Sequence, residues 1–175
     1  MAQIIHTSSL KLIACDLKML KTILNGRAAM AAALSVDVPE NWSEFGTQPI
    51  QWTHDQLASE PTHLNWLTYL GIHKKDQRLV STCGYKGKPD AQGIVEIGYE
   101  VHPDYRLKGL ATEIAQALVG HAFSQPKVKQ VIAHTLAKKN ESSSVLQKAG
   151  FSYYSKIDDP EDGLIWQWRA TLRPL

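Results

Sequence analysis

The 175-residue sequence has only two cysteines, and none of its apolar runs approaches the roughly 18 residues that a membrane-spanning helix needs. Cys15 and Cys83 stand in apolar surroundings without a partner motif, so we expect two buried free thiols and no disulfide framework. The N-terminus lacks the charged start, apolar run and cleavage site of a signal peptide. We therefore expect a cytoplasmic protein that does not enter a membrane.

An excess of charge of one sign is also missing. The sequence has 19 Lys and Arg against 17 Asp and Glu, and this net charge of +2 is too small to indicate a nucleic-acid surface. The seven histidines form no H-E-x-x-H motif or Cys/His cluster, so no metal site is expected. Phosphate motifs of the G-x-x-x-x-G-K-[ST] and G-x-G-x-x-G types are absent, so neither a P-loop nor a Rossmann site is supported.

The chain does have enough apolar residues, 43%, to form one domain over residues 1–175. A strand is predicted at 10–15, followed by helices at 17–25 and 27–34. Strands at 66–74, 78–87 and 93–102 are joined by short turns and predict an antiparallel meander. A helix at 109–123, a strand at 129–136, a helix at 140–150 and closing strands near 151–157 and 164–172 follow. This order predicts a mixed α/β domain.

The segment 38–61 is rich in proline and tryptophan, and we expect it to be irregular apart from a short helix at 54–59. Trp42, Trp52 and Trp66 can line an acceptor pocket, but large aromatic residues more often belong to a core. The acidic run 158–163 can attract a cationic amine, although a turn between the last two strands explains it more simply. Lys86 lies in a hairpin connection and is expected to be solvated.

A basic, glycine-containing loop stands between a predicted strand and the helix at 109–123. It consists of Arg106, Leu107, Lys108, Gly109, Leu110 and Ala111. Unpaired N–H groups and the helix dipole favour an anion at a helix start, and glycine lets a phosphate approach the backbone. Arg106 and Lys108 add positive charge, so the expected ligand is a pyrophosphate. The alternative is a basic helix start on a solvated surface.

The same six residues match R/Q-x-x-G-x-G/A, the acetyl-CoA loop of the GNAT superfamily of N-acetyltransferases. Downstream, "NESSSVLQKAGF" at 140–151 resembles that family's N-x-S-x-x-V-L-x-K-x-G-F helix and turn. "EIGYEVHPDYR" and "DGLIWQWR" are most similar to the Rim-type branch, whose members acetylate N-terminal amines of ribosomal proteins. Residues 1 to about 66 resemble that branch only loosely. The resemblance implies a GNAT-like single domain with a central, mostly antiparallel mixed sheet flanked by helices, and acetyl-CoA as co-substrate.

Acetyl transfer to an amine needs a base, hydrogen-bond donors for the oxyanion and a departing thiolate. Strand alternation places Glu96, Gly98 and Glu100 on one face, with Gly98 leaving space for a substrate. The resemblance implies that Glu96 can be the base; the alternative is a structural carboxylate. His134 is a second candidate base, because its pKa suits proton uptake near neutrality, but a lone strand histidine is more often simply packed.

The resemblance also implies that the backbone near Val101 binds the acetyl carbonyl, where the family splays this strand from its neighbour. Asn140 would then bind pantetheine or cap the helix, and Ser142 would donate a proton or bond locally to backbone. Many members place a tyrosine acid where this chain has Leu146. Ser142 or water would then supply the proton, or the thiolate leaves unaided.

Three functions are compatible with these features. The main hypothesis is a Rim-type N-acetyltransferase that transfers acetyl directly to a primary amine, such as a protein N-terminus, in a ternary complex. The acceptor can instead be a small amine such as an amino acid, a polyamine or an antibiotic. The third hypothesis is a non-catalytic acyl-CoA-binding or interaction module on the same fold. A monomer and a homodimer are both compatible with the sequence.

Overall fold

The predicted meander is confirmed in the computed structural model, which describes residues 1–171. Its strands are β3 (Thr68–His73), β4 (Arg78–Tyr85) and β5 (Ile94–Val101), and each pairs antiparallel with the next. The burial of β5 alternates, with Val95, Ile97 and Val101 buried, as the sequence pattern predicts. The meander forms the centre of the sheet.

The remaining strands extend this sheet on both sides. They are β1 (Ile4–His6), β2 (Leu10–Ala14), β6 (Gln130–Leu136), β7 (Ser152–Asp159) and β8 (Gly163–Thr171), and the sheet order is β1-β2-β3-β4-β5-β6-β8-β7. Among these pairs only β5 and β6 run parallel, so the mostly antiparallel mixed sheet is confirmed for residues 1–171. The strand β1 is too short to show a periodicity and was not predicted. Leu172, the last residue of a predicted strand, lies outside the described residues.

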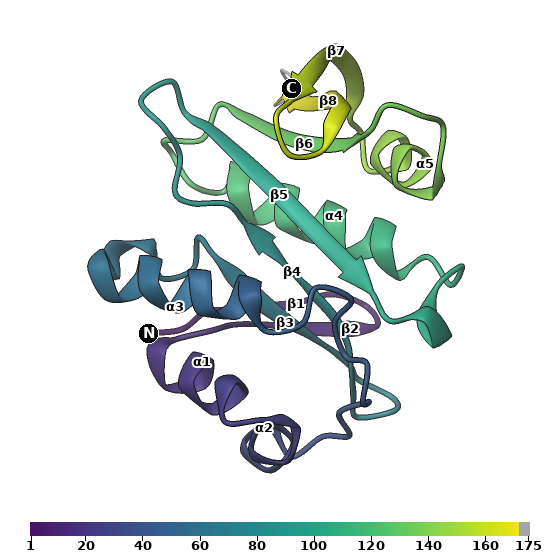
Figure 1. The fold of residues 1–175 in the computed structure, drawn as a ribbon. Coiled ribbons are helices and arrows are strands. Elements are labelled where there is room, and N and C mark those ends of the chain that lie inside the picture. The colour runs from purple at the N-terminus through teal and green to yellow at the C-terminus, as the bar shows by residue number, and fades with distance from the viewer. Residues whose placement is uncertain (172–175) are drawn as a thin grey trace.

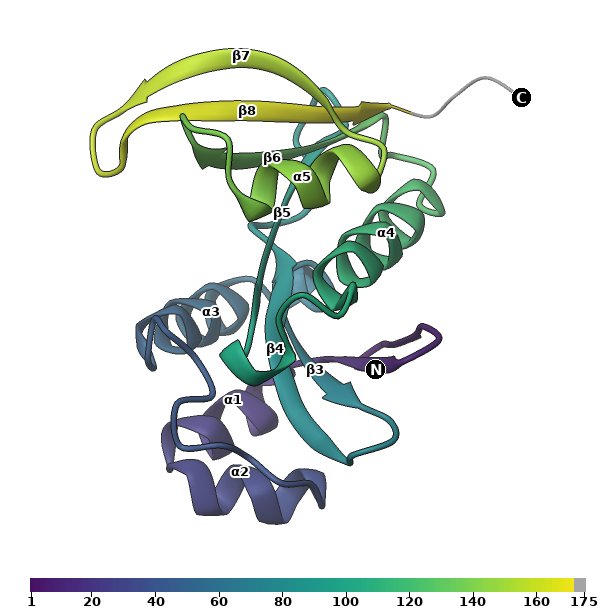
Figure 2. The ribbon, with the colours of Figure 1, turned by 90° about the vertical axis from the view of Figure 1, so that its right-hand side faces the viewer.

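Helices cover both faces of the sheet. They are α1 (Leu17–Leu24), α2 (Arg27–Leu34), α3 (Gln48–Ser59), α4 (Leu110–Phe123) and α5 (Glu141–Lys148), with 3₁₀ turns at Pro61–His63 and Pro103–Tyr105. Figure 1 and Figure 2 show α1, α2 and α3 on one side of β3 and β4, and α4 on the other. Two apolar clusters result, one under α1–α3 and one under α4 and α5.

The helix predicted at 54–59 is twice as long as expected, because α3 already begins at Gln48. Pro49 lies in the first turn of this helix, where a proline costs no hydrogen bond, since those N–H groups have no helical partner. Ile50, Thr53 and Leu57 form the buried side of this helix. Much of the segment that was predicted to be irregular is therefore a helix that packs on one face of the sheet.

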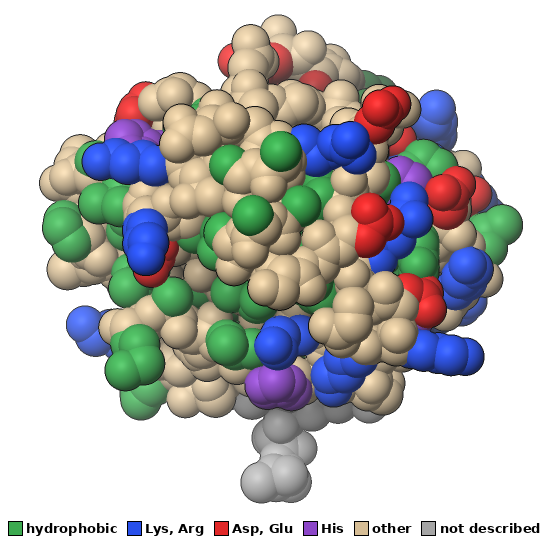
Figure 3. Space-filling view, turned by 90° about the horizontal axis from the view of Figure 1, so that it is seen from below, with side chains coloured by type: hydrophobic (Ala, Val, Ile, Leu, Met, Phe, Trp, Pro, Cys, Tyr) green, Lys and Arg blue, Asp and Glu red, His purple; other side chains and the backbone are tan. Residues whose placement is uncertain are grey.

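The surface agrees with the small net charge. Figure 3 shows Lys and Arg side chains interspersed with Asp and Glu on the face seen from below. Within residues 1–171, no helix is long and apolar enough to cross a membrane. Both cysteines are buried free thiols, as predicted.

Candidate functional site

An opening in the sheet between β5 and β6 is the central feature of the site. The two strands pair only over Ile94–Gln130, Val95–Val131 and Glu96–Ile132, although β5 continues to Val101 and β6 to Leu136. Beyond Glu96 the strands separate, and the course of β5 away from β6 can be followed in Figure 1 and Figure 2. The splayed strand that the sequence comparison implied near Val101 is thus present.

Backbone donors face this opening. The N–H of Lys86 bonds to the carbonyl of Glu96 at 3.0 Å, and the N–H of His102 bonds to the carbonyl of Val80 at 2.8 Å, so even-numbered residues of β5 turn their polar groups toward β4. Successive residues of a strand point their N–H groups in opposite directions. The N–H groups of Tyr99 and Val101 therefore point toward the side that β6 has left.

The start of α4 is the second feature of the site. Its N-cap is Gly109, at φ 78°, which has no side chain to cap the first N–H groups. A Cβ at Gly109 would meet no atom within 4 Å, so the space in front of these N–H groups is open. Leu110, Ile114, Leu118 and Ala122 are buried and anchor the helix, as the four-residue repeat predicts. This geometry suits an anion at the helix start.

The two cations of the loop are less free than the sequence suggested. The Nε of Arg106 donates to the Val101 carbonyl at 3.0 Å, and its guanidinium also pairs with Glu44. The ammonium of Lys108 lies 4.7 Å from the centre of the Tyr105 ring. Arg106 thus holds the loop against β5. Lys108 would lose a contact with the Tyr105 ring rather than an ion pair, so turning its ammonium toward an anion costs less free energy than turning Arg106.

Glu96 and His134 meet, although 38 positions separate them in sequence. His134 Nδ1 lies 2.9 Å from Glu96 Oε1, and the ammonium of Lys86 lies 2.5 Å from the same oxygen. The Glu96 side chain is 20% exposed. No hydrogen bond to Glu96 Oε2 is found within residues 1–171. The Lys86 side chain is 60% exposed, as expected for a solvated lysine, and it also forms this ion pair with Glu96.

A hydrogen-bonded chain sets the tautomer of His134. Arg169 Nε donates to Gln167 Oε1 at 2.9 Å, which leaves Gln167 Nε2 facing His134 Nε2 at 3.2 Å. Because an amide nitrogen is a donor only, His134 Nε2 must accept this bond, and its proton is then on Nδ1, directed at Glu96. His134 therefore supports the Glu96 carboxylate through Nδ1, and the lone pair of its Nε2 is already occupied by Gln167.

A cavity of about 760 Å³ opens on the Glu96 face of β5. The residues that line it come from 42–53, from β3, β4 and β5, and from the turn between β7 and β8. Gly98 lies in its floor, and a Cβ added there would meet no atom within 4 Å, so the space that the sequence predicted beside Glu96 exists. Glu96 and His134 do not line the cavity, but Lys86, which binds Glu96, does.

Aromatic residues form one wall of this cavity. Trp42, Phe45 and Trp52 all line it, and Trp52 is 48% exposed. The core interpretation is therefore wrong for Trp52, because α3 turns this side chain outward. Trp66 does pack against the core, with its ring 5.0 Å from that of Tyr85.

Sequence reasoning did not select two carboxylates of the cavity as site residues, although Glu161 belongs to the acidic run for which attraction of a cationic amine was considered. Glu100 accepts hydrogen bonds from the Thr82 hydroxyl and from the Glu44 N–H, the latter at 3.1 Å. Glu161 reaches the cavity from the predicted turn, in which Asp159 Oδ1 accepts the N–H groups of Glu161 and Asp162, both at 2.9 Å. Strand alternation gave a signal for Glu100, but nothing local indicated that a distant turn would face β5.

Asn140 and Ser142, at the start of α5, have different surroundings. Asn140 caps the helix by accepting the Ser143 N–H at 2.9 Å, and the Ser143 hydroxyl completes a capping box. Ser142 is not part of this box, and its hydroxyl faces Tyr99 on β5. Leu146 is 1% exposed in the core, so position 146 offers no donor to the site.

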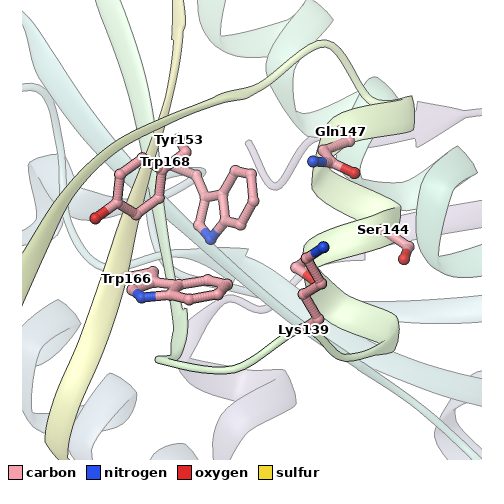
Figure 4. A pocket seen from close by; sticks show the side chains of 7 residues that line it. Lys139, Ser144, Gln147, Tyr153, Trp166 and Trp168 are labelled. Carbon is pink, nitrogen blue, oxygen red and sulfur yellow. The ribbon is translucent and has the colours of Figure 1, made fainter.

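A second hollow, of about 450 Å³, lies between α5 and the β7–β8 hairpin. Figure 4 shows Lys139, Ser144 and Gln147 facing Tyr153, Trp166 and Trp168 across it. Ser144 is two residues, or about 200°, around the helix from Ser142. This hollow is therefore on the other side of α5 from the opening between β5 and β6.

An opened parallel strand pair, an uncapped helix start and a carboxylate-bearing cavity together form the candidate site. The chain belongs to the acetyltransferase (GNAT) domain family, whose sequence profile matches residues 16–152. It is thus an N-acetyltransferase, and family membership favours the enzyme over the non-catalytic binding module. The prediction of this family from two short motifs is confirmed.

Related proteins agree with this assignment. An uncharacterized N-acetyltransferase, YjdG of Bacillus subtilis, is 25% identical over 150 residues, which are 85% of this chain and 89% of that protein. The structure of RimL, a ribosomal L7/L12 alpha-N-protein acetyltransferase in complex with coenzyme A, has a TM-score of 0.70 at 12% identity and covers 97% of this chain and 98% of its own. The ribosomal-protein-S5-alanine acetyltransferase of Vibrio fischeri has a TM-score of 0.70 at 15% identity, with 97% and 96% covered. These folds fit the predicted Rim-type branch.

Proposed function

We propose that this chain binds acetyl-CoA in the opening between β5 and β6 and transfers the acetyl group to a primary amine in the 760 Å³ cavity. The observation that carries the proposal is the position of the opening. The uncapped start of α4 follows β5 through a short loop, and the cavity has Gly98, Tyr99 and Glu100 of β5 in its wall. Donor and acceptor can therefore meet at the same strand.

The co-substrate is held by backbone and by few side chains. Its pyrophosphate occupies the space before Gly109, Leu110 and Ala111, where N–H groups lack a cap, with Lys108 as counter-charge. Leu107, at φ 59°, turns its backbone within this loop. Arg106 contributes mainly by fixing the loop to Val101.

The acyl end lies further along the opening. The Val101 N–H binds the acetyl carbonyl and stabilises the oxyanion, because it points into the opening rather than toward β4. The Asn140 amide nitrogen makes no hydrogen bond within residues 1–171 and can bind pantetheine, since the cap uses only the amide oxygen.

The acceptor is a primary amine, either a protein N-terminus or a small molecule. The rings of Trp42, Phe45 and Trp52 offer apolar contact, and Glu100 and Glu161 attract the ammonium form. Glu96 is the base, acting through water: its Oε2 has no partner within residues 1–171, and His134 and Lys86 fix Oε1. We place this reaction in the cytoplasm, in a monomer or a homodimer of single-domain chains.

The loop assignment is tested by Gly109→Asp. A carboxylate about 4–5 Å from a phosphate at an effective dielectric near 20 costs ~3–4 kcal/mol, so acetyl-CoA should bind more than about 100-fold more weakly. Calorimetric titration of the purified, CoA-free protein measures this.

Gly163→Asp is the matched control. Gly163 has φ 70° against 78° for Gly109, and a Cβ at either would meet no atom within 4 Å, so the two variants should carry similar backbone strain. Equal acetyl-CoA affinity of the two variants would refute the loop assignment. A screen of amines and N-terminal peptides, followed by thiol release, then identifies the acceptor class.

A further inference from the structure

Tyr99 carries a hydroxyl that the fold buries without a partner. Its Oη is inaccessible to solvent and makes no hydrogen bond within residues 1–171, one of four such side-chain atoms there. Burial raises the pKa of Tyr99 to about 12, and the nearby Ser142 hydroxyl lowers it in part. The two hydroxyls do not reach hydrogen-bond geometry, so the phenol stays an unused donor throughout the physiological pH range.

The position of this phenol is informative. Tyr99 lies on β5 in the stretch that has left β6, three residues past the last paired residue, Glu96. Its hydroxyl lies near that of Ser142 on α5, while the residue also lines the acceptor cavity. Tyr99 is therefore at the junction of the co-substrate cleft and the cavity.

We propose that the Tyr99 hydroxyl donates a hydrogen bond to the sulfur of CoA as the thioester breaks. The inference rests on the proposed acetyl transfer and adds a donor that Leu146 cannot supply. The amine nitrogen forms the C–N bond, and the C–S bond breaks with its electron pair on sulfur. The proton leaves nitrogen through water to Glu96, and sulfur departs as a thiolate held by Tyr99. Tyr99 keeps its own proton, so no further co-reactant is needed.

The direct test is Tyr99→Phe, with the ionisation of bound CoA as the first readout. Thiolate absorbance of the CoA complex is followed against pH, which needs no acceptor. If Tyr99 bonds to sulfur, the thiol of bound CoA should ionise at a lower pH in the wild type, with about tenfold more thiolate at a given pH than in the variant. Acetyl transfer should fall by about 10- to 100-fold with acetyl-CoA affinity changed less than about twofold.

Tyr69→Phe is the matched control. Tyr69 is buried, but its hydroxyl is satisfied by the Asn65 carbonyl at 2.8 Å, and it does not line the cavity. Tyr69→Phe should lower Tm and leave thiol ionisation unchanged, whereas Tyr99→Phe should not lower Tm, because it removes an unsatisfied group.

Identical thiol titrations of wild type and Tyr99→Phe would overturn the inference, as would equal kcat values. Failure of the proposed function would give a different result, because the wild type itself would then acetylate no amine. The thiol titration of bound CoA would still show whether Tyr99 bonds to the sulfur.

Discussion

At the scale of single residues, the site contains two carboxylates of β5 with different surroundings. Glu96 is bound by His134 and Lys86 and lies outside the cavity, whereas Glu100 lines the cavity and is bound by Thr82 and the Glu44 backbone. The sequence placed both on one face of the strand. We propose different roles for them because Glu96 contacts a supporting histidine, whereas Glu100 lines the cavity.

Glu96→Gln and Glu100→Gln should therefore affect different kinetic constants. Removal of the base should lower kcat by about 100-fold or more in Glu96→Gln, with acetyl-CoA affinity unchanged. Glu100→Gln should raise KM for the acceptor and largely preserve kcat, because the amide still fills the same space. Steady-state kinetics over a range of pH measures both, and the reverse pattern would transfer the base role to Glu100.

At the scale of elements, the fold fixes α4 to the N-terminal hairpin through Glu113. This first-turn carboxylate accepts hydrogen bonds from the Thr7 hydroxyl and from the Ser9 N–H, the latter at 2.6 Å. Burial by itself would raise the pKa of Glu113, but the bonds from Thr7 and Ser9 outweigh it and hold the pKa below its ordinary value of 4.5. The N-terminal end of α4, where we propose the anion site, is thus held by the turn between β1 and β2.

Glu113→Gln should destabilise the protein by about 1–2 kcal/mol near neutral pH, the scale of hydrogen bonds to a charged group in a partly exposed position. Since the folded-state pKa is depressed, the stabilisation is present above the ordinary carboxyl range and is lost as the pH falls through the depressed value. Urea unfolding of both proteins from neutral to acidic pH measures this.

Glu141→Gln is the control. Glu141 is exposed in the first turn of α5, so this variant also removes a carboxylate that interacts with a helix dipole. A stability difference for Glu113→Gln that persists unchanged at low pH would contradict the role given to the carboxylate.

At the scale of the whole molecule, the proposed donor and acceptor sites are built from different parts of the chain and meet at β5. The acceptor cavity takes residues from α3, the meander and the final turn, while the opening lies between β5, β6 and α5. Cys83 lines the cavity, but burial raises its pKa to about 12, so it is a poor nucleophile. Transfer should therefore be direct.

Initial-rate kinetics should give intersecting double-reciprocal lines when acetyl-CoA and amine are varied, because both must be bound before transfer. Cys83→Ala should retain the intersecting pattern and an activity within about threefold of the wild type, since a buried protonated thiol is not part of the reaction. Parallel lines, or an acetylated protein after incubation with acetyl-CoA alone, would instead require an acyl-enzyme.

Local patterns in the chain were enough to predict the family, the meander, the anchored helix α4 and the glycine at its start. These features depend on residues close together in the chain, where strand alternation, helix periodicity and motif spacing act directly. The folded arrangement was needed to find that His134 supports Glu96 from 38 positions away and that Trp52 faces a cavity. It was likewise needed to find that Glu161 reaches this cavity and that the Tyr99 hydroxyl is left unpaired beside α5. Such contacts follow from how strands separate and helices pack over the sheet, and no local pattern of residues encodes them.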